Sequence, residues 1–158
     1  MTWRGSTTVP DRIFACLPYV LPLVEGMGFG SYLFRDFPFL TLLLIPLSPI
    51  LAIYRNVPFV SLIIFFGLFF FVVRNEKINH FIRFNTMQAI LLNIVIFLCS
   101  IVLQIVSPIP GASFALEIIS NTIFLGIVAA VVYSVAQSLL GRYAEIPAIS
   151  DAVHLQVR

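Results

Sequence analysis

Four long runs without a charged residue constrain this chain more than any other feature of its sequence. The runs are residues 37–54, 56–73, 84–116 and 118–141, and a fifth apolar stretch, 13–34, is interrupted only by Glu25. A helix needs about 20 apolar residues to cross the ~30 Å hydrocarbon core of a bilayer. Backbone amides in lipid must also find partners within their own segment, which a helix provides. The runs therefore predict an all-α, polytopic integral membrane protein.

The composition excludes several classes of protein. Hydrophobic residues make up 60% of the chain and charged residues 10%, whereas soluble domains have about 45–50% and 25%. So few charges cannot cover a water-facing surface, which excludes a soluble enzyme, a secreted disulfide scaffold and a disordered tail. A net charge of +2 is too small to favour nucleic acid as a partner. Cys16 and Cys99 lie inside apolar runs, where they act as small apolar side chains.

The distribution of Lys and Arg predicts how often the chain crosses the membrane. Short cytoplasmic loops are enriched in these residues, and here they occur near both termini and in the loop 74–83, but not in the linker 107–120. Four crossings place both termini and the loop 74–83 on one side, whereas five would put the loop opposite the N-terminus. We therefore predict a single domain with four transmembrane helices. The predicted spans are 13–34, 57–73, 84–106 and 120–140, followed by a cytoplasmic or stromal tail, 141–158.

The segment 37–54 is predicted to be a broken helix that lies at the membrane interface or re-enters the membrane. It contains Pro38, Pro46 and Pro49, and the last two each remove a helical hydrogen bond. The segment 13–34 also contains prolines and glycines, together with Glu25. The sequence therefore leaves open which of these two segments crosses.

Glu25 is the one acidic residue that lies inside an apolar stretch and away from an evident loop. A carboxylate at the bilayer centre costs about 2.5–3.5 kcal/mol on insertion scales, so it usually faces a cavity or the bundle interior. Glu25 is thus a candidate polar residue in the lining of a membrane pore, or a residue whose contact fixes how the helices of the bundle pack. The alternative is a position near the far membrane face, because only nine residues separate it from Arg35.

Two helix faces carry further candidates. Asn93, Ser100 and Gln104 share one face of the predicted span 84–106, where they would bond to a neighbouring helix or line a water-filled path. In the last span, small residues at every fourth position would allow another helix to approach closely, inside the bundle or between copies in a homo-oligomer. These residues are Gly126, Ala130, Ser134 and Ser138.

The remaining polar residues do not predict an enzyme. His80 and His154 have no companions at metal-ligand spacing, and the sequence has no phosphate-binding glycine loop or nucleophile motif. We expect no catalytic residue, no cofactor and no metal. The polar stretch 74–83 is amphipathic, so we expect it to lie on the membrane surface with its Lys and Arg at the lipid headgroups.

Three stretches of the sequence resemble a known family. They are Pro18-Tyr19 with residues 22–26, Arg74-Asn75 followed by residues 83–89, and the tail segment 141–152. Over roughly residues 10–155 the chain resembles the twenty-kilodalton membrane subunit of the translocon at the inner envelope of chloroplasts, the Tic complex. No transit extension precedes the first apolar stretch, so we expect a cyanobacterial or plastid-encoded form.

The resemblance implies both a structure and a function. It implies four transmembrane helices with both termini in the stroma or cytoplasm, in the plastid inner envelope or the cyanobacterial plasma membrane. It implies a channel-forming or channel-associated part of a preprotein import machinery, with lipid, other translocon subunits and the translocating preprotein as partners. The residues that match the family are Arg83, Phe84, Asn85, Gln88, Tyr143, Ile146 and Pro147. We expect Arg83 to hold its helix at the interface, and Asn85 and Gln88 to satisfy neighbouring backbone groups.

Two other functions stay open on the sequence alone. Pro-broken segments and an intramembrane Glu25 are features that a small-solute or ion channel or transporter uses at a midplane site. A non-conducting assembly scaffold needs only packing faces, such as the small-residue stripe of the last span.

Overall fold

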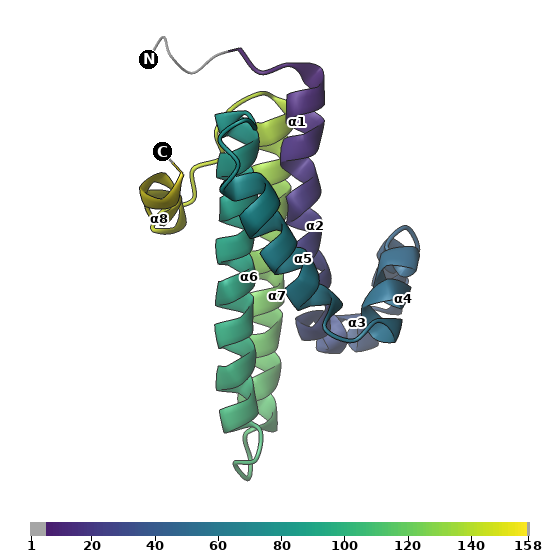
Figure 1. Ribbon diagram of the computed structural model, residues 1–158. Helices are drawn as coiled ribbons and strands as arrows, with labels where there is room; N and C mark the ends of the chain where they lie inside the picture. Colours follow the sequence, from purple (N-terminus) through teal and green to yellow (C-terminus); the bar gives the residue numbers. More distant parts are fainter. Residues whose placement is uncertain (1–5, 158) are drawn as a thin grey trace.

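The computed structural model describes residues 6–157, which form twelve helical segments and no strand (Figure 1). In chain order they are α1 (Val9–Cys16), η1 (Leu17–Tyr19), α2 (Val20–Gly26), η2 (Met27–Gly30), α3 (Ser31–Asp36), η3 (Pro38–Leu44), α4 (Ser48–Asn56), α5 (Val60–Leu68), η4 (Phe69–Val73), α6 (His80–Val106), α7 (Ser113–Leu139) and α8 (Ile149–Gln156). The prediction of an all-α protein is confirmed.

Three helical stretches are long and apolar enough to cross a membrane: Val9–Asp36, α6 and α7. The first begins at Thr8, whose hydroxyl accepts from the Asp11 N–H while the Asp11 carboxylate accepts from the Thr8 N–H. Asn79 caps α6, because its side-chain oxygen accepts from the Phe81 N–H. At 27 residues each, α6 and α7 are about 40 Å long, which exceeds the ~30 Å hydrocarbon core.

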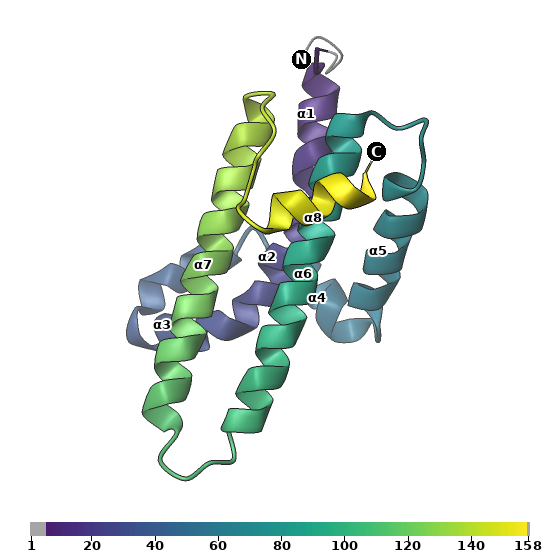
Figure 2. The same ribbon diagram turned by 90° about the vertical axis from the view of Figure 1, so that its left-hand side faces the viewer.

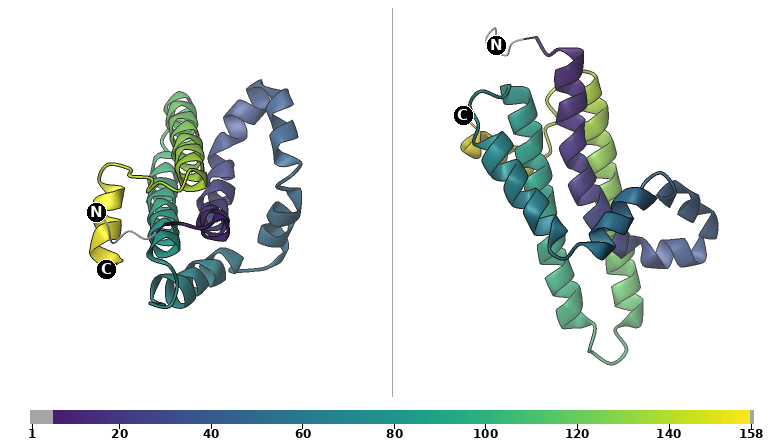
Figure 3. Two further views of the ribbon diagram at one scale, coloured as in Figure 1. Left: turned by 90° about the horizontal axis from the view of Figure 1, so that it is seen from above. Right: turned by 45° about the vertical axis from the view of Figure 1, so that its right-hand side comes forward.

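The segment between α3 and α5 is bent, as its prolines predict. The helices η3 and α4 meet at an angle of 81°, and only if this pair counts as one span does the number of candidate spans rise from three to four. Pro38 begins η3, and Pro49 lies in the first turn of α4. Figure 3 shows α3, η3 and α4 as a loop that extends to one side of the bundle. The prediction of a Pro-broken helix at 37–54 is confirmed.

The predicted span 57–73 begins later in the structure. Helix α5 has nine residues and η4 has five, so the pair is about 20 Å long and shorter than the hydrocarbon core. Val57 precedes a proline and is extended, and Phe59 has a positive φ of 58°, so the helix cannot start before Val60. A crossing at this segment stays a prediction.

The termini of the described chain and the basic loop lie toward the same end of the bundle. Figure 1 shows the start of α1, the loop between η4 and α6, and the end of α7 at this end, with α8 nearby. The turn between α6 and α7, where Gly111 has a φ of +81°, lies at the opposite end. Figure 2 shows α8 lying across α6. This arrangement brings the basic segments together, as the charge distribution predicts.

Two apolar clusters hold the bundle together. The first lies between the N-terminal stretch, α6 and α7, and its buried members are Tyr19, Phe29, Ala89, Leu92, Ile96, Phe124, Ile127 and Val131. The second lies between η4, α6 and the C-terminal segment, and its buried members are Val73, Phe84, Met87, Ile90, Val153 and Val157. Many large apolar side chains on the outer faces are exposed, among them Phe71, Ile105 and Phe114. Such a surface suits hydrocarbon and not water.

Gly26 and Gly28 provide a matched test of how closely the first stretch approaches α7. A Cβ on Gly26 would lie 2.8 Å from Cγ2 of Ile127, whereas a Cβ on Gly28 would meet nothing within 4 Å. We expect Gly26→Ala to lower the free energy of unfolding by about 1–3 kcal/mol, because the branched side chain of Ile127 must move to make room for the added methyl group. Gly28→Ala should leave it unchanged or raise it by up to about 1 kcal/mol. Thermal unfolding in detergent micelles measures both, and equal melting temperatures would contradict the close approach.

Candidate functional site

A chain of buried side-chain hydrogen bonds joins the N-terminal stretch, α6 and α7. The Tyr19 hydroxyl donates to Oδ1 of Asn85 at 2.8 Å, and the Ser138 hydroxyl donates to the same oxygen at 2.9 Å. Nε2 of Gln88 donates to the Tyr19 hydroxyl at 3.0 Å and to Oγ of Ser134 at 3.4 Å. These five side chains are at most 1% exposed. We call them the buried polar network.

The buried polar network closes the interior of the bundle. Nδ2 of Asn85 also donates to the Phe81 carbonyl one turn earlier, so both ends of this amide are used. Gln88 bonds to side chains, not to the backbone groups that the sequence analysis expected, and its Oε1 is buried without a partner. Interhelical hydrogen bonds of this kind hold membrane helices together. Since none of the five side chains is open to solvent, the network does not line a path through the bundle.

Arg83 connects the start of α6 to the end of η4. Its Nε donates to the Val73 carbonyl at 2.9 Å, and the residue is only 9% exposed. Nearby, Nδ2 of Asn79 donates to Oδ2 of Asp11 at 3.2 Å, which links the start of α6 to the start of α1. Arg83 thus lies at the end of the bundle that carries the basic loop, and its role at the membrane interface stays a prediction.

The C-terminal segment folds back onto α6. The Tyr143 hydroxyl lies 2.9 Å from Nδ1 of His80, and the Tyr143 ring packs edge-on against Phe81 and Phe84 with centroids 5.1 and 4.9 Å apart. Ile146 packs against the first apolar cluster, and Pro147 is exposed before α8. The matching residues of the two signature stretches, distant in sequence, therefore lie at one end of the bundle.

Glu25, Asn93 and Ser100 line one pocket between α2, α5 and α6, with a volume of about 380 Å³. Ser61 of α5 adds a fourth polar side chain, and the other walls are apolar. Oδ1 of Asn93 is buried without a partner, and the Ser100 hydroxyl donates to the Phe97 carbonyl at 2.6 Å. We call this site the Glu25 pocket. Gln104, which lies further along the same face of α6, is exposed and does not line it.

The Glu25 pocket lies near the middle of the long helices. Gly26, the next residue, packs against Ile127. Ile127 and Asn93 lie within one residue of the midpoints of α7 and α6, about 20 Å from either helix end. Arg35, in contrast, reaches Glu117 near the start of α7, with their N and O atoms 3.5 Å apart. This geometry favours an interior position for Glu25 over one at the far membrane face.

The small-residue stripe of α7 divides between the interior and the surface. Ser134 and Ser138 belong to the buried polar network, and Ala130 packs against the first apolar cluster. Gly126 is exposed, and a Cβ placed on it would meet nothing within 4 Å. Packing within this chain therefore uses three of the four positions.

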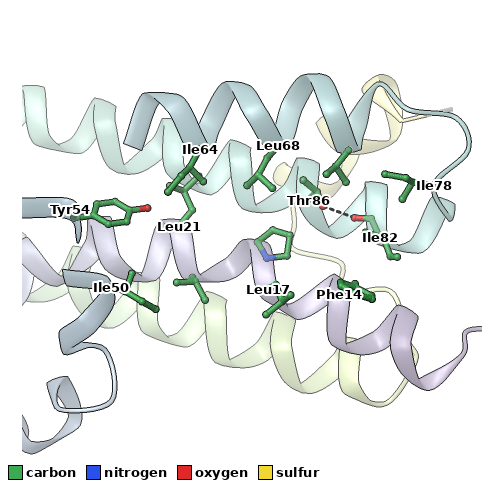
Figure 4. Close-up of a pocket in the computed structure, with 13 residues that line it drawn as sticks. Phe14, Leu17, Leu21, Ile50, Tyr54, Ile64, Leu68, Ile78, Ile82 and Thr86 are labelled. Carbon is green, nitrogen blue, oxygen red and sulfur yellow. Dashed lines mark hydrogen bonds between the residues drawn. The ribbon is translucent and has the colours of Figure 1, made fainter. Parts of the chain in front are cut away.

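A second pocket, of about 470 Å³, is almost entirely apolar. Figure 4 shows it between Leu17 and Leu21 of the N-terminal stretch and Ile64 and Leu68 of α5, with Tyr54 at one end. The Thr86 hydroxyl in its wall donates to the Ile82 carbonyl. Its walls suit lipid hydrocarbon, whereas the Glu25 pocket carries a carboxylate and an unpartnered amide oxygen.

The chemistry of the Glu25 pocket is that of a binding site. In residues 6–157, no three His, Cys, Asp or Glu side chains are grouped closely enough to hold a metal ion. One carboxylate and one amide oxygen instead suit a single cationic or hydrogen-bond-donating group. Ser61 was not among the residues predicted from the sequence, and Tyr19 stood out only as part of a motif. A tyrosine inside an apolar span was the available signal, because a buried hydroxyl usually finds a partner.

Comparison with known proteins gives consistent similarities. A family model described as "Chloroplast import apparatus Tic20-like" matches residues 7–153. A "Tic20 family protein" of Synechocystis is 48% identical, over 100% of this chain and 99% of the relative. "Protein TIC 20-II, chloroplastic" of Arabidopsis thaliana is 34% identical over 99% of this chain and 78% of its own length. "Tic20 family protein Ycf60" of Porphyra purpurea is 33% identical, over 99% and 80% of the two chains.

Asn85 and Asn121 provide a matched test of the buried polar network. Asn85→Ala removes the acceptor of two buried hydroxyls, so we expect the free energy of unfolding to fall by about 1–3 kcal/mol. Oδ1 of Asn121 in α7 is buried without a partner, so Asn121→Ala should be nearly neutral. Melting temperatures in detergent micelles compare the two variants. Equal losses would mean that Asn85 matters only by its volume.

Proposed function

Because the chain belongs to the Tic20-like family of chloroplast import apparatus components, we propose that it is a membrane subunit of a protein-translocation complex. Within that complex we propose a channel-associated role: the chain contributes one wall of a polypeptide passage, and partner subunits complete it. This role is more specific than the description of the family, and the support for it is the geometry of the bundle.

The observation that carries this proposal is the closed interior of the bundle. The buried polar network joins the N-terminal stretch, α6 and α7 through side chains that are at most 1% exposed. A polypeptide could pass between these helices only if the network were broken. A passage at the outer surface needs no such rearrangement, but it requires neighbours to close it.

The face of α6 with polar side chains is the proposed wall. Ser100 lines the Glu25 pocket, and Gln104 follows it along this helix, toward the turn that joins α6 to α7. Their surroundings on the helix are apolar, so an amide at Gln104 facing only lipid would be unfavourable. A water-containing passage or a polar partner relieves this cost.

We propose the following arrangement in the membrane. The chain crosses four times, with Val9–Asp36, α6 and α7 as full spans and α5 with η4 as the short one. The basic loop and both terminal segments face the stroma or cytoplasm, in the plastid inner envelope or in a cyanobacterial plasma membrane. The positive-inside rule supports this orientation, and the common end of these segments supports an even number of crossings.

Two other roles are less well supported by the geometry. A small-solute or ion pathway through a single chain meets the same closed interior. A role as a non-conducting scaffold, in turn, does not explain why α6 exposes polar side chains on one face. Catalysis forms no part of the proposal.

Photo-crosslinking at Gln104 and Val102 tests the proposed wall. These residues differ by two positions, so they lie at nearly the same depth and about 200° apart around α6. Both are exposed, Val102 by 52%. With a photo-reactive amino acid in the assembled complex, we expect an arrested precursor to be captured at position 104 roughly tenfold more often than at position 102. Equal capture, or none at position 104 in an intact complex, would overturn the proposal.

A further inference from the structure

We propose that the Glu25 pocket receives a single Lys or Arg side chain from a transmembrane helix of another polypeptide. The inference goes beyond the proposed function by naming the chemistry of one partner contact. It rests on the proposed function only in that the chain assembles with other membrane subunits.

The Glu25 carboxylate has no partner of opposite charge in the described part of the chain. None of the ion pairs or side-chain hydrogen bonds of residues 6–157 includes it. Tyr54, at the end of α4, lies within electrostatic reach, but it is a neutral phenol and donates no hydrogen bond to Glu25. A half-buried carboxylate near the middle of the membrane-spanning bundle therefore lacks a counter-charge.

The cost of this arrangement points to an external partner. A carboxylate at the bilayer centre costs about 2.5–3.5 kcal/mol on insertion scales, and such groups pair with one another or face polar cavities. Oδ1 of Asn93, in the same pocket, is a second acceptor without a donor. Two acceptors on adjacent helices suit one cationic group with several N–H donors.

The shape of the pocket suits a long cationic side chain and not a metal ion. At about 380 Å³ the pocket is far larger than an ion, and Glu25 is the one carboxylate among its lining residues. Apolar side chains, including Phe29, Leu62 and Phe97, form most of its walls. The methylene groups of Lys or Arg pack on apolar walls while the charged end reaches polar atoms.

Neither the long helices of the described chain nor lipid supplies a cation near the middle of the bundle. The Lys and Arg of residues 6–157 lie at helix ends or in loops; they are Arg12, Arg35, Arg55, Arg74, Lys77, Arg83 and Arg142. The three long helices of a second copy, Val9–Asp36, α6 and α7, therefore offer no cation near their middles. Lipid amines lie in the headgroup region, above the hydrocarbon core.

The residues at the rim of the pocket indicate that the partner is a transmembrane helix. Leu62, Ile94 and Phe97 line the pocket and are 52%, 38% and 63% exposed, so the opening faces the lipid. In hydrocarbon, a polypeptide satisfies its backbone as a helix. A basic side chain at the middle of such a helix would be costly in lipid and stabilised beside Glu25.

A synthetic helix tests this site without any precursor. The probe is a transmembrane Leu/Ala peptide of about 20 residues with one central Arg, co-reconstituted with the chain in phosphatidylcholine vesicles. Energy transfer between labels on the peptide and on the protein measures association. We expect Glu25→Gln to weaken association roughly tenfold or more, as the loss of a charge-assisted hydrogen bond requires. A peptide with citrulline in place of Arg should bind both proteins weakly.

Glu117→Gln is the matched control, because Glu117 is already paired with Arg35 near a helix end. It should leave association with the Arg peptide unchanged, and the melting temperature of each variant shows that it is folded. Equal association of the Arg peptide with the wild-type protein and with Glu25→Gln would overturn the proposal. So would a citrulline peptide that binds the wild-type protein as tightly as the Arg peptide does. So would the same Glu25 dependence for a soluble, extended Arg peptide, since the site would then serve a passing chain. Precursor crosslinking at Gln104 is independent of all these outcomes.

Discussion

The hydrogen bonds that converge on Oδ1 of Asn85 determine how the rest of the bundle is arranged. Tyr19 reaches this oxygen from the N-terminal stretch and Ser138 reaches it from α7, so three helices meet at one side chain of α6. Because hydrocarbon offers no alternative partner, the rotation and height of each helix are restricted at this level. The close contacts of Gly26 with Ile127 and of Gly30 with Phe124 then follow further along the same helices.

This fixed contact separates two regions with different properties. On the side of the basic loop, the network, Arg83 and the C-terminal segment fill the space between helices with aromatic rings and with polar groups that, apart from Oε1 of Gln88, are hydrogen-bonded. Nearer the turn between α6 and α7, polar side chains face outward, and in the Glu25 pocket the Glu25 carboxylate has no ion-pair partner and Oδ1 of Asn93 has no hydrogen-bond partner. The first region accounts for stability within the chain. The second is where other molecules have unsatisfied groups to bind.

Charge and proline patterns were sufficient to predict the helical class, the broken segment at 37–54 and the common end of the basic segments. Spacing along α6 correctly grouped Asn93 with Ser100, because residues seven apart share a helix face. The sequence could not predict that Glu25 and Ser61 face these residues, since that depends on how α2 and α5 pack against α6. Nor could it assign Gln88 to Tyr19 and Ser134, because an amide inside a span has many potential partners. The start of α5 was missed for a local reason, the positive φ of Phe59.

The order of the network residues along the chain also has a consequence for biogenesis. Tyr19 and Asn85 enter the membrane well before Ser134 and Ser138, which belong to the last long helix to be synthesised. Until α7 arrives, Asn85 and Gln88 keep their bonds to Tyr19, but Asn85 lacks the Ser138 hydroxyl and Gln88 lacks Ser134. The buried polar network is thus complete only once α7 packs against α6.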